Sequence, residues 1–322
     1  MSGISRRKFL KTTVAGSSAL AVASTKTAFG MKEFHGYPDS MGVLVDLTRC
    51  IGCRTCEAAC NKEHGLPEPE LPFDDFSVFD QVFHDGKQKR RTSAEAYTVV
   101  NRYDVKDKDG QGAPVFRKIN CNHCNEPACL TSCFVNAYTK TKEGAVIYNA
   151  DVCVGCRMCM VACPFRIPAY SYDSALHPQV IKCNFCYDTR LKNGKPPACV
   201  EACPQEALTF GHRKTLVKVA HERIREQPKK YVDHVYGETE VGGTSWMYLS
   251  GVPFDKVGFD TTLQHHPILD NTKSFLSFVP MVLGIWPAMF LGFHLLAKGG
   301  KGEKERKESI NKEKEHADES SN

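Results

Sequence analysis

The residues of this 322-residue chain that can do chemistry are its sixteen cysteines. They fall into four quartets, and no cysteine lies outside a quartet. The quartets are Cys50, Cys53, Cys56 and Cys60; Cys121, Cys124, Cys129 and Cys133; Cys153, Cys156, Cys159 and Cys163; and Cys183, Cys186, Cys199 and Cys203. The third, followed by Pro164, matches a C-x2-C-x2-C-x3-C-P run that binds iron–sulfur clusters. We therefore predict four [4Fe–4S] clusters with all sixteen thiolates as iron ligands, and an electron carrier.

Two other roles for the cysteines compete with this one. The fourth quartet consists of two cysteine pairs separated by 12 residues, a spacing that also fits a zinc ribbon. A C-x2-C-x2-C-x3-C run, in contrast, holds too many thiolates in one loop for a single tetrahedral ion. An even number of cysteines in an exported chain also fits a disulfide framework, which the predicted route of export argues against.

The N-terminus predicts that route. Residues 5–11 (SRRKFLK) form a twin-arginine signal, and a weakly apolar stretch with small residues follows over residues 12–23. We expect a signal peptide over residues 1–30, with cleavage after Ala23, Ala28 or Gly30. Signals of this kind direct the export of proteins that have already folded. Clusters would then be assembled in the reducing cytoplasm, which leaves no free thiols to oxidise outside.

A second targeting feature lies near the C-terminus. Residues 274–297 form a run of 24 residues without Asp, Glu, Lys or Arg, which as a helix spans about 36 Å. This length suffices for a membrane, and a membrane helix tolerates the included Pro280 and Pro287. Basic residues follow at once, so residues 298–322 are predicted to be a disordered cytoplasmic tail. The alternative is a buried helix of a soluble protein. His294 either reaches the membrane interface or has a functional role.

The net charge excludes one class of partner. The formal charge is +5, and residues 1–30 contribute five basic side chains and no acidic one. The mature chain is therefore nearly neutral, and we expect no nucleic-acid partner.

The middle of the chain predicts an α+β fold. We expect strands over residues 97–105, 145–148 and 207–210, and a polar turn over residues 107–112. A helix is predicted over residues 213–226, with Leu216, Val217, Ala220 and Ile224 along one face. Residues 41–212 would form tandem bacterial-ferredoxin-like domains with insertions at residues 61–120 and 187–198. Residues 213–273 would form a helix and a docking segment after the clusters.

Other candidate residues are few. His265 and His266 precede the apolar run and either bind a metal or lie exposed. Arg157 and Lys182 lie beside cysteines, where their charges either tune potentials or face solvent. The chain has neither a dinucleotide-binding glycine loop nor a phosphate-binding P-loop.

The whole chain resembles the four-cluster ferredoxin-type subunits of membrane-bound periplasmic oxidoreductases. The signal, the sequence MGVLVD at residues 41–46, the four quartets and the apolar run carry this resemblance. Residues 236–253 further resemble a segment of the HybA-type subunits of uptake nickel–iron hydrogenases. The resemblance implies that the quartets exchange their fourth ligands. The four implied ligand sets are Cys50, Cys53, Cys56 with Cys203; Cys183, Cys186, Cys199 with Cys60; Cys121, Cys124, Cys129 with Cys163; and Cys153, Cys156, Cys159 with Cys133.

The resemblance also implies a non-catalytic subunit on the periplasmic face of the bacterial inner membrane. It would relay electrons from or to a hydrogenase, which consists of a small and a large subunit. The other end of the relay would be an integral membrane subunit that reacts with quinone. The alternative partner is a molybdopterin enzyme, such as a formate dehydrogenase or a polysulfide- or thiosulfate-type reductase. A third hypothesis is a zinc-stapled structural adaptor without redox function.

Overall fold

The structure, a computed structural model, describes residues 37, 39–80, 89–106, 112–172 and 179–319. The described residues up to Asn271 form one compact unit, and those from Thr272 onward belong to another. The predicted signal peptide and nearly all of the predicted turn at residues 107–112 lie outside the described residues.

A three-stranded sheet forms the centre of the first unit. Its middle strand, β1 (Met41–Asp46), pairs antiparallel with β8 (Leu208–His212) and in parallel with β9 (Trp246–Leu249). Val43 faces the same core as Trp246, whereas Leu44 contacts the core on the other face. Because β1 is buried on both faces, its sequence is almost continuously apolar.

Helix α6 (Arg213–Glu226) covers one face of this sheet and has the predicted bounds. Leu216, Ala220 and Ile224 are buried against Leu44, and Val217 is partly buried beside them. The apolar residues recur at helical spacing, so their burial against the sheet confirms the predicted face.

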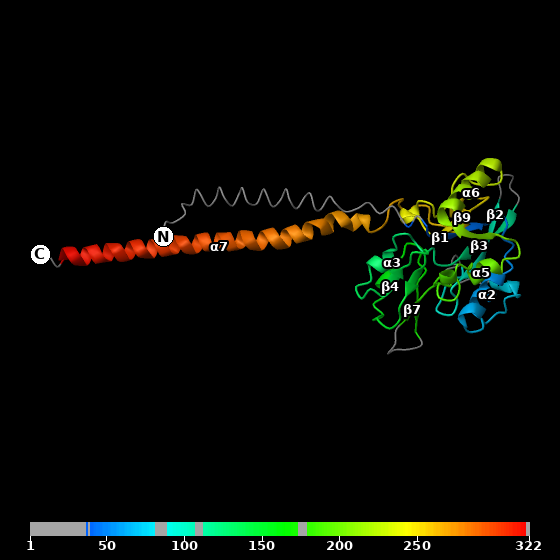
Figure 1. Cartoon of the computed structure of the whole chain (residues 1–322), viewed down its shortest axis with the longest axis horizontal. Helices are drawn as coiled ribbons and strands as arrows, with labels where there is room; N and C mark the ends of the chain where they lie inside the picture. Colours follow the sequence, from blue (N-terminus) through cyan, green and yellow to red (C-terminus); the bar gives the residue numbers. More distant parts are fainter. Residues whose placement is uncertain (1–36, 38, 81–88, 107–111, 173–178, 320–322) are drawn as a thin grey trace. The chain divides into compact units, whose positions relative to one another are not determined.

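The remaining elements of this unit are short. Three antiparallel hairpins are formed by β2 (Val99–Lys106) and β3 (Gly112–Ile119), β4 (Tyr138–Lys140) and β5 (Val146–Tyr148), and β6 (Ala169–Ser171) and β7 (Gln179–Ile181). The short α-helices are α2 (Thr55–His64), α3 (Ala128–Thr131), α4 (Met158–Ala162) and α5 (Ala198–Glu201). Single 3-10 turns are η1 (Phe76–Phe79), η2 (Leu191–Asn193), η3 (Glu240–Gly242) and η4 (Phe254–Val257). Figure 1 shows α3, β4 and β7 on one side of the unit and α2 and α5 on the other. This mixture of helices and strands confirms the α+β class, whereas the division into tandem ferredoxin-like domains remains a prediction.

The segment after the last cysteine is part of the same core. Trp246, Met247 and Leu249 on β9 are fully buried, and Tyr236 and Val257 pack beside the sheet. Residues 236–257 therefore contribute the strand on the edge of β1 that β8 leaves free, and they pack into the same core as the cysteine-bearing region. A docking role for the segment remains a prediction.

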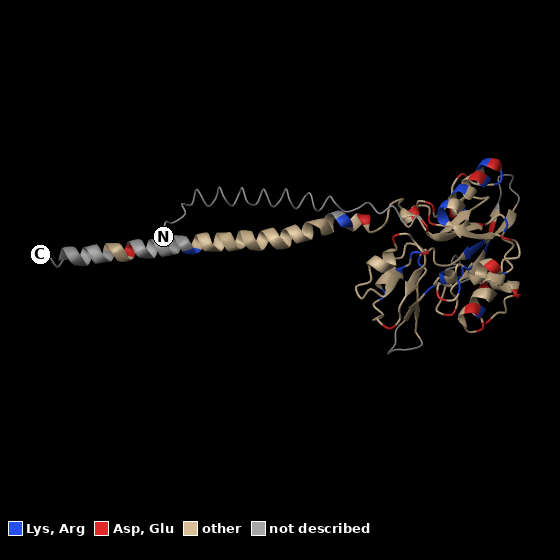
Figure 2. Cartoon of the chain, in the orientation of Figure 1, with Lys and Arg blue, Asp and Glu red and all other residues tan. Residues whose placement is uncertain are grey.

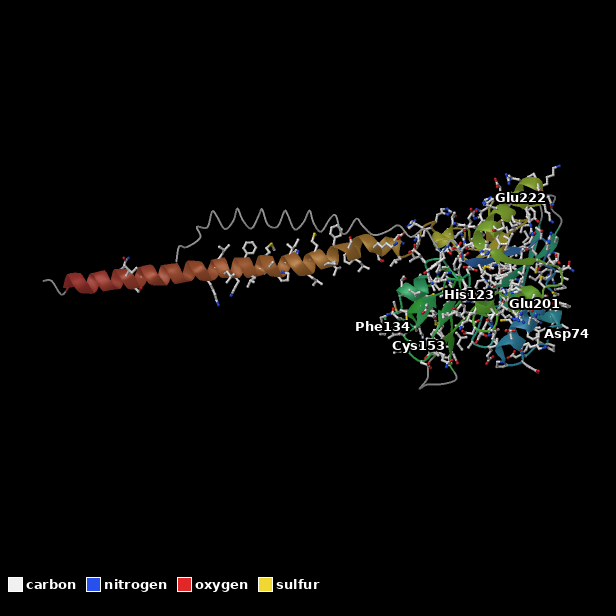
Figure 3. All side chains as sticks on the ribbon, in the orientation of Figure 1. Asp74, His123, Phe134, Cys153, Glu201 and Glu222 are labelled. Carbon is white, nitrogen blue, oxygen red and sulfur yellow. The ribbon has the colours of Figure 1, made fainter. Side chains whose placement is uncertain are left out.

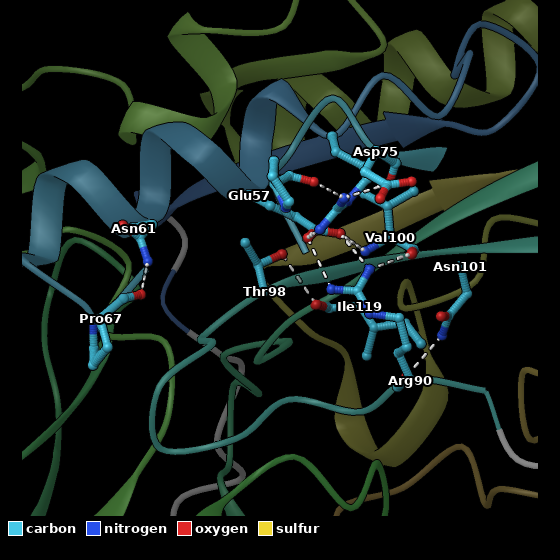
Figure 4. A network of polar contacts seen from close by, with 11 residues as sticks. Glu57, Asn61, Pro67, Asp75, Arg90, Thr98, Val100, Asn101 and Ile119 are labelled. Carbon is cyan, nitrogen blue, oxygen red and sulfur yellow. Dashed lines mark hydrogen bonds and ion pairs between the residues drawn. The ribbon is translucent and has the colours of Figure 1, made fainter. Parts of the chain in front are cut away.

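A buried ion-pair network holds helix α2 against the insertion that follows it (Figure 4). The carboxylate of Glu57 accepts hydrogen bonds from Arg54, from Arg90 at 3.0 and 3.1 Å, and from the backbone N–H of Val100 at 2.5 Å. Arg54 also donates to the carbonyl of Pro72 at 2.7 Å. Three separate stretches of chain therefore meet at one carboxylate on the helix that carries Cys56 and Cys60.

Helix α7 (Asp270–Glu319), which includes Pro280 and Pro287, belongs to the second unit from Thr272 onward. Among the described residues, Asp270–Lys298 is the one stretch long and apolar enough to cross a membrane, with a mean hydropathy of 1.8. Figure 2 shows charged residues on either side of residues 274–297 and no Asp, Glu, Lys or Arg within that run. The helix continues to Glu319, where the sequence predicted disorder; Lys and Glu, which dominate this tail, are good helix formers.

Candidate iron–sulfur centres

Each quartet begins with a loop whose backbone is shaped to face negative charge. The residue before the second cysteine has a positive φ, between 49° and 73°, in all four loops: Gly52, His123, Gly155 and Phe185. Such a turn directs consecutive backbone N–H groups into one concave site that favours anions. The N–H of Gly155 donates to Cys153 Sγ at 3.4 Å, and that of Phe185 donates to Cys183 Sγ at 3.4 Å. The loops therefore present both thiols and N–H donors to an anionic cluster.

The third and fourth cysteines of each quartet are separated by one helical turn. The third cysteines of the four quartets, Cys56, Cys129, Cys159 and Cys199, lie on α2, α3, α4 and α5. Cys60 remains on α2, whereas the other three fourth cysteines lie at or just beyond the end of their helix. The helical turn carries each fourth thiol away from the loop that begins its quartet.

The structure brings Cys203 to the first quartet. Cys50, Cys53, Cys56 and Cys203, which we call set A, line one small cavity of about 30 Å³. Burial raises the pKa of the Cys50 thiol to about 11, and electrostatic repulsion from Cys203 and Cys53 contributes further. Thiols from the first and fourth quartets therefore face a common space.

The structure also places Cys60 beside the fourth quartet. Burial raises the pKa of Cys60 well above its ordinary value, and repulsion from Cys183, Cys199 and Cys186 adds to this rise. We call Cys183, Cys186, Cys199 and Cys60 set B. The exchange of fourth ligands between sets A and B, which the resemblance implies, remains a prediction.

The second and third quartets also lie beside each other, and the resemblance implies the same exchange for them. Cys121, Cys124, Cys129 and Cys163 form set C, and Cys153, Cys156, Cys159 and Cys133 form set D. Burial raises the pKa of Cys163 to about 11, and its neighbouring thiol is that of Cys121. Burial also raises the pKa of Cys159, with repulsion from Cys153, Cys156 and Cys133.

The four sets follow one another in a single order. Cys56 of set A lies within electrostatic range of Cys199 of set B, and Cys183 of set B lies within range of Cys121 of set C. Repulsion between Cys129 and Cys159 then joins set C to set D. These neighbours link set A to set B, set B to set C and set C to set D.

An aromatic stack lies at the junction between sets B and C. His123 precedes Cys124, Phe185 precedes Cys186, and their ring centroids are 4.8 Å apart. Both residues adopt positive φ, at a cost of about 1–2 kcal/mol each for a side chain with a Cβ. His123 Nδ1 accepts from the N–H of Val146 at 2.9 Å, which places the ring proton on Nε2. That buried Nε2 has no protein partner among the described residues.

The thiols present fit iron–sulfur clusters. All sixteen cysteines are free, and Cys156 alone is exposed. Burial raises the pKa of Cys129 and of Cys183 to about 12, so these sites need a cationic ligand to hold thiolates. In the described part of the chain, no three Cys, His, Asp or Glu side chains converge on the point that a single metal ion would need.

Three lysines lie among the thiol sets, and the sequence identified only one of them. Lys182 is buried, as is Lys118, and Lys140 is mostly buried. Lys182 donates to the carbonyls of Val146 and Cys183, and Lys140 donates to those of His123 and Gly144 at 2.9 and 2.7 Å. Lys118 and Lys140 had no sequence signal, because a lysine on a strand usually marks a solvent-facing position.

The other sequence candidates lie at the surface. Arg157 is exposed and stacks on the rings of Tyr170 and Tyr172, 4.0 and 5.3 Å from their centroids. His265 and His266 are exposed and hydrogen-bond to Thr239 and Asn271, in agreement with the non-ligand alternative.

Comparison with known proteins identifies the family. Residues 114–213 match the family described as the 4Fe-4S dicluster domain. The hydrogenase-2 operon protein HybA of Escherichia coli O157:H7 is 32% identical over 79% of this chain and 83% of its own length. The chain belongs to the ferredoxin-type iron–sulfur electron-transfer subunits.

Two further relatives fit this family membership. The iron–sulfur subunit of the nitrate-inducible formate dehydrogenase of Escherichia coli K12 is 30% identical over 70% of this chain and 74% of its own length. A protein of Nitratidesulfovibrio vulgaris is 52% identical over 91% of this chain and 77% of its own length. The family therefore includes relatives named for hydrogenase and for formate dehydrogenase.

Proposed function

We propose that this subunit relays electrons through four [4Fe–4S] clusters, bound by sets A, B, C and D, between a periplasmic nickel–iron hydrogenase and a membrane subunit that reacts with quinone. The observation that carries the proposal is the single order of the four thiol sets. Bound clusters would supply one-electron redox chemistry, and electron transfer requires that neighbouring clusters lie close together. The sets are supported by the β8-β1-β9 sheet, the Glu57 network and the short helices that carry the third cysteines.

The surface around set D supports its role as one terminus of the relay. Phe134, Val154 and Val161 are 70%, 55% and 81% exposed, and Cys156 is the exposed thiol (Figure 3 labels Phe134 and Cys153). Exposed apolar side chains gathered around one site favour contact with a partner protein. A partner docked there would exclude water from the cluster and shorten the path for the electron.

Hydrogenase is the preferred catalytic partner because of the segment after the clusters. Residues 236–253 resemble the corresponding segment of hydrogenase subunits of HybA type, and this segment contributes β9 to the central sheet. The likeness to formate dehydrogenase iron–sulfur subunits favours the alternative, a molybdopterin enzyme. Purification in mild detergent tests the two: we expect the co-purified complex to reduce a viologen dye with hydrogen. Reduction of the dye with formate, and none with hydrogen, would contradict the hydrogenase as partner and support the molybdopterin enzyme.

We also propose that α7 anchors the subunit in the inner membrane, with the cysteine-bearing unit in the periplasm. The apolar stretch has the necessary length, and the basic residues after it favour a cytoplasmic C-terminus.

The proposed location predicts an export defect. Changing Arg6 and Arg7 together to Lys should retain folded, cluster-bearing protein in the cytoplasm, because a receptor reads the arginine pair as an address. Cell fractionation with immunoblotting measures the periplasmic share, and a single Lys11→Arg variant serves as the control. Normal periplasmic accumulation of the double variant would contradict this route.

A further inference from the structure

Lys118 is a buried cation without an acidic partner among the described residues. It lies on β3, is 3% exposed, and donates from Nζ to Asn120 Oδ1 at 2.8 Å. Its Nζ also lies 4.5 Å from the centroid of the Trp246 ring. No carboxylate of the described chain forms an ion pair with it. A buried charge is costly unless other charges compensate it.

The groups that compensate Lys118 are thiols from two different sets. It lines the cavity of set A, beside Cys56. The thiols of Cys199, Cys183 and Cys60, which belong to set B, also lie within electrostatic range of Lys118. Lys118 therefore lies between sets A and B.

The other two buried lysines lie near set C. Burial lowers the pKa of Lys140 to about 7, and the thiolates that oppose this change are Cys124 and Cys121. Lys182 lies within electrostatic range of Cys129. Each lysine therefore has its own thiol neighbours, and Lys118 alone of the three is flanked by sets A and B.

We propose that Lys118 is a positioning residue that acts as a shared fixed counter-charge for the clusters of sets A and B and raises the reduction potentials of both. The reason is electrostatic: reduction adds one negative charge to a cluster, and a fixed cation nearby stabilises the reduced form more than the oxidised form. Strand β3 belongs to the insertion between the first two quartets, and it bears Lys118. This insertion would therefore supply the charge that tunes both clusters.

The test is a redox titration of the intact, cluster-loaded protein, monitored by electron paramagnetic resonance. The inference rests on the proposed function, so iron and acid-labile sulfide are measured first in the wild type, where about sixteen irons per chain are expected. Wild-type protein without iron–sulfur clusters would overturn the proposed function itself. With clusters present, Lys118→Met should shift the midpoint potentials of two clusters to more negative values and leave the other two unchanged.

Two variants serve as controls. Lys140→Met should leave those two midpoints unchanged and shift a cluster of set C instead. Lys118→Arg keeps the charge and should retain midpoints close to wild type. If Lys118→Met loses iron while Lys118→Arg keeps it, the positive charge is needed to hold these clusters, which supports the proposal. A fully loaded Lys118→Met with unchanged midpoints would overturn it, as would equal shifts in the Met and Arg variants.

Discussion

Replacing Cys60 by alanine should destroy the cluster site of the fourth quartet and spare that of the first. Cys60 follows Cys56 by one turn of α2, yet its thiol neighbours are Cys183, Cys199 and Cys186. Without its fourth thiolate this cluster should be lost or converted to a three-iron species. Because set B is an internal station of a single series, electron throughput should fall at least about tenfold, the lower end of what loss of a group supporting a metal ligand costs.

Two other alanine variants define the comparison. Cys199→Ala should perturb the same paramagnetic signal as Cys60→Ala, since both thiols belong to set B. Cys53→Ala should perturb a different signal, because its thiol lines the cavity of set A. The exchange of fourth ligands would be wrong if Cys60→Ala matched Cys53→Ala and left the Cys199 signal intact.

The sequence predicted those parts of the fold whose pattern is local. Helix α6 was predicted with its bounds because apolar residues recur at helical spacing, and the predicted strands correspond to β2, β5 and β8. The quartets were evident because their spacing reflects one local loop and one helical turn. Spacing alone could not supply the partners of the fourth thiols, because these contacts join different quartets, and Cys60 and Cys183 are more than a hundred positions apart.

Features that depend on distant contacts were missed. Strand β9 lies in parallel beside β1, although about two hundred residues separate them, and its short apolar sequence did not predict a central strand. Lys118 and Lys140 resembled surface lysines, because nothing near them in sequence shows that thiols surround them. Their burial becomes understandable only when the anionic charge of the bound clusters is counted, and a single-sequence pattern does not contain that charge.

Replacing Glu57 by alanine should be the most destabilising change outside the cysteines. Glu57 is 4% exposed, and its carboxylate is bound by Arg54 and Arg90 and by the N–H of Val100 (Figure 4). Its removal leaves Arg54, which is 1% exposed, without its ion-pair partner. Breaking a buried ion pair in this way costs about 3–5 kcal/mol.

The measurement is guanidinium denaturation of the loaded protein, followed by loss of the visible absorption of the clusters. Asp104→Ala is the matched control, since it removes a carboxylate whose pair with Arg102 at 2.9 Å is exposed and contributes at most about 1 kcal/mol. Because α2 carries Cys56 of set A and Cys60 of set B, the Glu57 variant should release iron from sets A and B before sets C and D. Equal midpoints of denaturation for the Glu57 and Asp104 variants would show that α2 is held by the clusters themselves, and that the network contributes little to the stability of this half of the relay.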